Sequence, residues 1–165
     1  MARNFDEFYR AEFTGLVVLA VGVTGQRLGA EDLVQEAMLD AFRRWDRVGA
    51  YENPRAWVRK VVVQRAVKSS KKAKNERAAG ARRLLSAVEP DGWIEFDPVV
   101  RDALLGLPSQ QRAAMALHYL EDLSVRDTAE LLGVADGTVK SHLARGRLHL
   151  GATLKSDPAR STTND

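Results

Sequence analysis

One stretch of this sequence restricts the fold more than any other: residues 125–150 read VRDTAELLGVADGTVKSHLARGRLHL. Ala129 is a small residue in the middle of a short helical segment, and Gly133 follows four residues later, where a turn with positive φ suits glycine. Ser124 and Asp136 are placed to cap the two segments. The apolar seam between them consists of Leu132, Val134, Val139 and Leu143. This spacing predicts two short helices joined by a tight turn, the helix-turn-helix motif.

The second of these helices has a polar side that suits contact with DNA. Lysine and arginine side chains there can reach phosphates, and lysine, serine or arginine can reach base edges in a major groove. An ordinary helical hairpin with a basic last turn would carry similar charge, since helices often end in lysine and arginine. Spacing, glycine, cap and charge agree, which favours DNA binding. The candidate residues are Thr138, Lys140, Ser141, Arg145 and Arg147.

Helical spacing of apolar residues also runs through the first half of the chain, without strand-like alternation. A first helix is expected from Phe5 into the apolar run of residues 16–23, with a break at Thr24 and Gly25. A second is expected from near Glu31, whose carboxylate suits a first helical turn. Pro54 suits the first turn of a third helix. A further helix, capped by Ser109, is expected just before the helix-turn-helix. We therefore predict an all-α fold.

Composition divides the chain into two helical domains joined by a linker. Apolar periodicity fades where Gly80, Pro90 and Gly92 accumulate, and it returns after Asp97. We predict a first domain over residues 1–75, a linker over 76–96, a helix-turn-helix domain over 97–155 and a flexible tail over 156–165.

The charge is unevenly distributed, although the net charge is only +3. Residues 1–54 hold six Lys or Arg and nine Asp or Glu, whereas residues 55–83 hold eleven Lys or Arg and one acid, Glu76. Such a basic block attracts polyanions by releasing their counterions, and its binding should depend strongly on salt. A solvated helix with a basic face is the alternative interpretation of the same charges.

The chain lacks the residue clusters that catalysis or metal binding needs. It has no cysteine, which excludes disulfides, thiolate metal sites and cysteine nucleophiles. Its three histidines, His118, His142 and His149, include no pair four residues apart, and no carboxylate pair beside them completes a metal site. Ser141 and His142 point in different directions on a helix, so they form no catalytic dyad. We expect no catalytic residue, no metal and no cofactor.

The apolar residues do not suggest a membrane protein. The longest apolar run, residues 16–23, is far shorter than the roughly 20 residues of a membrane-spanning helix. It is preceded by Asp6, Glu7 and Glu12, whereas a signal peptide begins with basic residues. The sequence therefore predicts a cytoplasmic protein without membrane insertion.

Two stretches resemble the extracytoplasmic-function class of bacterial RNA polymerase sigma factors. The segment AEDLVQEAMLDAFRRWDRV, followed by NPRAWVRKVVVQRA, resembles sigma region 2, which melts the promoter. The segment LPSQQRAAMALHYLEDLSVRDTAELLGVADGTVKSHLARGRLHL resembles sigma region 4, the helix-turn-helix domain. With their flanks, the two stretches cover nearly everything except the linker and the tail. The resemblance implies a sigma factor that binds core RNA polymerase and recognises the −10 and −35 elements of promoter DNA.

The resemblance also implies where each partner binds. In this family the acidic helix docks on the clamp helices of the polymerase β′ subunit, and the C-terminal domain docks on the β flap. The residues expected on the clamp helices are Asp32, Gln35, Glu36 and Asp40. The loop before the third helix, together with that helix, would hold a base flipped from the melted strand in a basic groove. The residues expected at the −10 element are Val48, Tyr51, Asn53, Arg55, Arg59, Lys60, Gln64, Arg65, Lys68, Lys71 and Lys72.

Three positions depart from the family pattern. The family commonly has asparagine at the position of Gln64, often an acid near Lys68, and often arginine at the position of His142. The resemblance also makes an anti-sigma factor a candidate partner.

Two other function classes are weighed against the sigma factor. A helix-turn-helix repressor or activator would carry a sensor or dimerisation half at its N-terminus, and that half should show a surplus of pocket-lining apolar residues. Residues 55–83 are strongly basic instead. A nuclease would need clustered carboxylates or histidines, and the sequence shows none.

Overall fold

A computed structural model describes residues 3–78 and 98–155, and every regular element in these two ranges is a helix. The predicted all-α fold class is confirmed. The chain forms two compact units, Met1–Ala81 and Arg82–Asp165, and each unit is described separately below.

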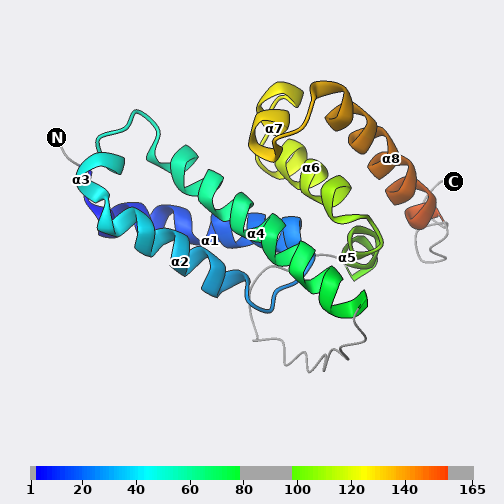
Figure 1. Cartoon of the computed structure of the whole chain (residues 1–165), viewed down its shortest axis with the longest axis horizontal. Coiled ribbons are helices and arrows are strands. Elements are labelled where there is room, and N and C mark those ends of the chain that lie inside the picture. The colour runs from blue at the N-terminus through cyan, green and yellow to red at the C-terminus, as the bar shows by residue number, and fades with distance from the viewer. Residues whose placement is uncertain (1–2, 79–97, 156–165) are drawn as a thin grey trace, which may run out of the picture. The chain divides into compact units, whose positions relative to one another are not determined.

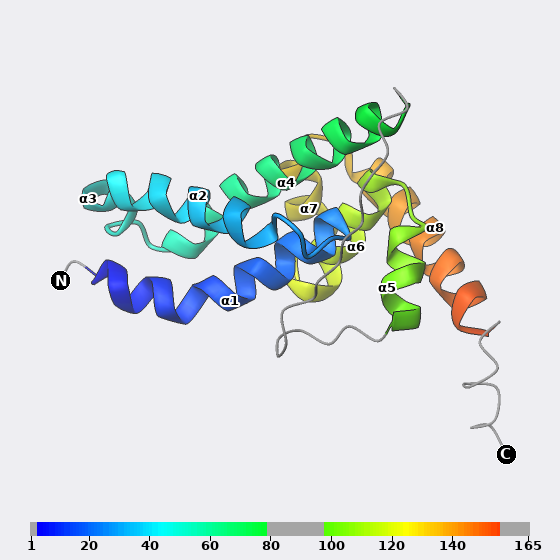
Figure 2. The same cartoon turned by 90° about the horizontal axis from the view of Figure 1, so that it is seen from below.

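The first unit contains four helices: α1 (Phe5–Thr24), α2 (Ala30–Arg43), α3 (Trp45–Val48) and α4 (Pro54–Ala78). The three long helices pack against one another in pairs, with the short α3 directly after α2 (Figures 1 and 2). Their shared core is fully buried and includes Leu16, Leu19, Val34, Met38, Val58 and Val62. Truncating one such leucine to alanine typically costs about 2–5 kcal/mol, so the apolar stripes of these helices determine how they pack.

Local sequence signals set the helix ends in this unit. The Asn4 side chain accepts a hydrogen bond from the Asp6 backbone N–H at 2.9 Å, which caps α1. Gly25 ends α1 with φ of 71°, a left-handed conformation that glycine adopts at little cost. Helix α4 begins at Pro54, as the sequence predicts, and runs to Ala78. The helix thus continues three residues into the predicted linker, and residues 79–96 of that linker lie outside the described residues.

The second unit contains α5 (Pro98–Leu105), α6 (Ser109–Leu120), α7 (Val125–Leu132) and α8 (Asp136–Lys155). Helix α8 packs against all three others, and α6 also packs against α7 (Figure 1). The buried core consists of Leu107, Ala114, Met115, Ala129, Val139 and Leu143. The tail predicted over 156–165 lies outside the described residues.

The helix-turn-helix forms at the predicted place. Ser124 caps α7, since its Oγ accepts a hydrogen bond from the Asp127 backbone N–H at 3.0 Å. Gly133 ends α7 with φ of 67°, and its N–H donates back to the carbonyls of the last turn. Two predicted caps are wrong. Ser109 is the first residue of α6, so that Pro108 stands at its N-cap position, and Asp136 is likewise the first residue of α8. At the first position of α8 the Asp136 carboxylate still favours the helix N-terminus through the helix dipole.

A close approach between α6 and α8 fixes the packing of the second unit. A Cβ added at Gly146 of α8 would lie 2.8 Å from Cγ and Sδ of Met115 on α6. Both residues are buried. Glycine at this position therefore lets α8 lie directly on α6, and the sequence pattern alone did not single it out.

Candidate nucleic-acid interface

Helix α4 presents a row of polar side chains to solvent. Lys60, Gln64 and Lys68 recur every four residues, so they lie on one side of the helix, and all three are exposed. Arg59 is half-buried beside them. The opposite side of α4 carries the buried Val58 and Val62. This row, here called the α4 stripe (Lys60, Gln64 and Lys68), can meet a polyanion without any change of the fold; the side chains of Lys71 and Lys72 lie outside those described.

Arg55 belongs to the basic block in sequence but is paired within the fold. Its Nε donates to Oε2 of Glu12 on α1 at 2.5 Å, and both side chains are about 70% buried, with 29% and 28% of their surfaces exposed. A partly buried ion pair of this kind joins α4 to α1. It neutralises the positive charge of Arg55, which had been expected to contact the −10 element. Glu12 was not among the predicted functional residues, because nothing local marks it as a partner for a residue 43 positions away.

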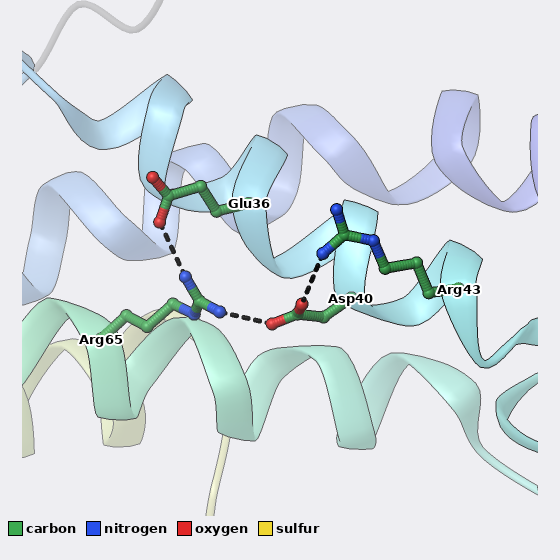
Figure 3. A network of polar contacts seen from close by, with 4 residues as sticks. All are labelled: Glu36, Asp40, Arg43 and Arg65. Carbon is green, nitrogen blue, oxygen red and sulfur yellow. Dashed lines mark hydrogen bonds and ion pairs between the residues drawn. The ribbon is translucent and has the colours of Figure 1, made fainter.

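Arg65 is paired as well, with two carboxylates of α2 (Figure 3). Its Nη1 donates to Oε2 of Glu36 at 2.7 Å, and its Nη2 donates to Oδ2 of Asp40. Asp40 also lies near Arg43, with Nη1 of Arg43 3.9 Å from its Oδ1. The fold thus brings together residues that the sequence analysis had assigned to two different partners.

The rest of the predicted polymerase face lies along α2. Asp32, Gln35 and Glu36 are exposed, whereas Asp40 is half-buried against Arg65. The buried side of the same helix carries Val34, Ala37, Met38 and Ala41. The acidic face is therefore open to a cationic surface at its N-terminal end and partly neutralised at its C-terminal end.

The loop between α3 and α4 divides its predicted residues between core and surface. Val48 is fully buried and packs into the core. The Asn53 side chain accepts a hydrogen bond from the Ala56 backbone N–H at 3.1 Å, and so caps α4. Tyr51 is 41% exposed. Of these three predicted residues, Tyr51 alone offers an aromatic face to solvent, where a base could stack on it.

Helix α8 begins with an exposed polar surface. Thr138, Lys140, Ser141 and Arg145 are all exposed, whereas Val139 and Leu143 are buried. Arg147 is also exposed, but its Nη1 donates to the Tyr119 hydroxyl of α6 at 3.1 Å. Tyr119 was not predicted as a partner, since its contact with Arg147 depends on how α6 and α8 pack.

His142 lies between these polar residues and differs from them in charge. The pKa of its imidazole is lowered from the usual 6.5, mainly by burial and to a smaller extent by the positive charge of the nearby Arg145. Its Nδ1 is buried and has no hydrogen-bond partner among the described residues. His142 is therefore neutral at pH 7, so this position lacks the charge of the arginine that the family often carries here.

The described residues contain no group of three or more His, Asp or Glu side chains that could hold a metal ion. Within residues 3–78 and 98–155, none of the helices combines the length and apolar character needed to cross a bilayer.

Comparisons with known proteins agree with this two-part arrangement. Residues 8–76 match the family described as Sigma-70 region 2, and residues 99–150 match the family described as Sigma-70, region 4. The chain is 33% identical to the ECF RNA polymerase sigma factor SigM of Mycobacterium tuberculosis over 153 residues, which cover 91% of this chain and 76% of SigM. It is 28% identical to the RNA polymerase sigma-E factor of Streptomyces avermitilis, over 93% of this chain and 86% of that protein.

A solved structure of a sigma factor is also similar to this chain. The sigma factor RpoE from Bartonella quintana, crystallised in complex with the anti-sigma factor NepR, is 28% identical and superposes with a TM-score of 0.71. The similarity covers 93% of this chain and 98% of that one.

Proposed function

Since the chain belongs to the extracytoplasmic-function class of RNA polymerase sigma factors, we propose a specific role for each exposed surface of its two units. A sigma factor binds core RNA polymerase and directs it to promoter DNA, and this chain has both family regions. A repressor or activator with a sensor half is not favoured, because residues 8–76 match sigma region 2. The family is not one of enzymes; we propose that the chain acts in the cytoplasm with the polymerase, without a catalytic residue, metal or cofactor of its own.

The α4 stripe is proposed to contact the phosphates of the melted −10 strand, with Tyr51 stacking on an unpaired base. The supporting observation is that Lys60, Gln64 and Lys68 are exposed together on one side of α4. Val48 and Asn53 support this surface indirectly, the first by packing and the second as the α4 cap. Arg59, Lys71 and Lys72 are proposed to extend the basic groove.

The start of α8 is proposed to enter the major groove of the −35 element. Thr138, Lys140 and Ser141 lie in the first two turns of this helix, which are the turns that reach base edges in helix-turn-helix proteins. Arg145 and Arg147 lie further along and are proposed to contact phosphates.

This assignment is tested by measuring promoter preference with variants of α8. Lys140→Ala and Ser141→Ala should change which −35 sequence is preferred, because a base-edge contact discriminates by about 1–3 kcal/mol. Arg145→Ala should weaken binding to all sequences alike, since a phosphate contact carries no sequence information. If all three variants scale every promoter equally in run-off transcription, Lys140 and Ser141 do not read base edges and the assignment is wrong.

The exposed part of the acidic α2 face is proposed to bind the β′ clamp helices of the polymerase. The second unit is proposed to bind the β flap. Asp32→Arg combined with Gln35→Arg raises the net charge by three and leaves the contacts of Figure 3 in place. We expect this variant to bind labelled core polymerase at least tenfold more weakly, because like charges meet across the interface. Glu7→Arg combined with Thr14→Arg makes the same charge change on exposed positions of α1 and serves as the control. Equal affinity of the two variants for core would contradict the assignment.

An anti-sigma factor is proposed as a further partner, because the similar RpoE was crystallised with NepR. The tagged chain, purified from its own host, should carry a protein whose removal raises run-off transcription with added core polymerase. A purified chain that is fully active before any such removal would contradict this proposal.

A further inference from the structure

The contacts between α2 and α4 link the two surfaces proposed for the first unit. We name Glu36, Asp40 and Arg65 the carboxylate–arginine cluster (Figure 3). Glu36 and Asp40 come from the acidic face of α2, whereas Arg65 comes from the basic helix that carries the α4 stripe. Arg65 uses Nη1 to bind the carboxylate of Glu36 and Nη2 to bind that of Asp40.

These ion pairs are accessible enough to exchange partners. The Glu36 side chain is 66% exposed, Arg65 is 36% exposed and Asp40 is 24% exposed. Partly exposed pairs of this kind contribute only modestly to the free energy of folding, since water and salt still reach them and screen them. A guanidinium bound in this way can therefore be transferred to a phosphate, and the carboxylates can be transferred to another cation, without unfolding the helices.

We infer that Arg65 couples the two partners: a cationic protein surface that binds Glu36 and Asp40 releases Arg65 to an anionic strand on α4, and the strand in turn releases the carboxylates. This inference rests on the proposed function, in which the cationic surface is the β′ clamp and the strand is the melted −10 DNA. Both partners displace the same internal ion pairs. The partner that binds second therefore does not have to break them, and it binds more tightly than it would alone. The coupling is reciprocal by thermodynamic linkage.

The expected size follows from the exposure of the pairs. Taken at the range for surface pairs, the two partly exposed ion pairs together change a binding constant by about twofold to thirtyfold. One additional phosphate contact also increases the magnitude of the log–log salt slope for single-stranded DNA by about 0.7. Both quantities are measurable on the full chain.

The first experiment measures binding of labelled single-stranded DNA of mixed sequence to the full chain without polymerase. Glu36→Gln with Asp40→Asn should tighten binding and increase the salt slope beyond the effect of a charge-matched control, Glu31→Gln with Asp46→Asn. These control carboxylates are exposed on the same unit and lie outside the cluster. Adding Arg65→Gln to the first pair should weaken strand binding to about the level of the control pair, because the freed guanidinium is then absent. Adding Arg65→Gln to the wild type or to the control pair should have a smaller effect, because Arg65 is held by its carboxylates in both.

The result that overturns the inference is an equal effect of Arg65→Gln in all three backgrounds. Far-ultraviolet circular dichroism and thermal melting check that each variant is folded. If the double substitution does not fold, Glu36→Gln alone, at the most exposed position of the cluster, should change affinity in the same direction by a smaller factor.

The second experiment measures the affinity of labelled core polymerase for the full chain. Arg65→Gln removes the internal competitor, so the dissociation constant for core should fall by about twofold or more relative to wild type. An unchanged or raised dissociation constant would overturn the competition.

One further variant separates failure of this inference from failure of the proposed function. Lys60→Ala with Lys68→Ala should weaken strand binding if the α4 stripe is the strand site. If that variant binds the strand like wild type, the proposed strand site is wrong. If it binds weakly while Arg65→Gln acts equally in every background, the strand site stands and only the coupling is wrong.

Discussion

The contact between Gly146 and Met115 predicts opposite effects for two glycine-to-alanine substitutions on the same helix. Both Gly146 and Gly151 lie inside α8, where alanine is intrinsically favoured over glycine by about 0.8–1.0 kcal/mol. A Cβ at Gly151 has no neighbour within 4 Å, whereas a Cβ at Gly146 lies 2.8 Å from two side-chain atoms of the buried Met115. The propensity gain is therefore realised in full at one position and opposed at the other.

The magnitudes follow from these contacts. Overpacking a well-filled core costs about 1–3 kcal/mol, and Cγ of Met115 is too close to its own backbone to move aside easily. Subtracting the propensity gain, Gly146→Ala should destabilise the second unit by about 1 kcal/mol, with a range of roughly 0–2. Gly151→Ala should stabilise the same unit by up to about 1 kcal/mol. The difference between the two variants, about 2 kcal/mol, is a larger signal than either change alone.

Amide hydrogen exchange on the full chain measures this without requiring two-state unfolding of both units together. Amides in α6 and α8 should exchange roughly fivefold faster in Gly146→Ala and up to roughly fivefold slower in Gly151→Ala, since about 1.4 kcal/mol corresponds to a factor of ten. Amides of α1 and α4, in the other unit, provide the internal reference. If Gly146→Ala slows exchange in α6 and α8 as much as Gly151→Ala, the reasoning from the α6–α8 contact is refuted.

Three further outcomes are expected. Gly133→Ala should destabilise the helix-turn-helix by about 1–2 kcal/mol, because the residue has φ of 67°; an unchanged denaturation midpoint for the second unit would contradict this. The pKa of His142 is lowered in the native state, so the unfolded chain binds more protons at this site. The second unit should therefore lose stability as the pH falls through about 6.5, and His142→Gln should remove that part of the pH dependence of amide exchange. Lys60→Ala with Lys68→Ala should reduce the magnitude of the log–log salt slope for single-stranded DNA by about 1.4, and an unaltered slope would mean that the α4 stripe does not meet phosphates.

Much of the helix-turn-helix could be predicted because its signals are local. Ser124 needs only the N–H three residues ahead, and Gly133 needs only its own freedom of φ. The exposure of Lys140 and Ser141 follows in the same way, since Val139 and Leu143 define the buried side of the helix. The resemblance to the sigma family uses these same short segments, which is why it could be identified before the fold was known.

The roles of Arg55 and Arg65 could not be predicted from the sequence. Both belong to the block in which eleven basic residues accompany one acid, and within that block nothing distinguishes them from Lys60 or Lys68. Their partners, Glu12, Glu36 and Asp40, lie 25 to 43 residues earlier in the chain. Which cations are neutralised depends on which sides of α1, α2 and α4 face each other.

The sequence by itself determined the long helices and the glycine turn, because these depend on neighbours within a few residues or on helical periodicity, and the resemblance of two of its segments indicated the family. Only the tertiary structure decided that Arg65 pairs with the acidic face, that Val48 is core and that α8 rests on Met115 through Gly146. The physical reason is that ion pairing and close packing depend on distances between side chains of different helices, and these distances exist only after the helices have packed.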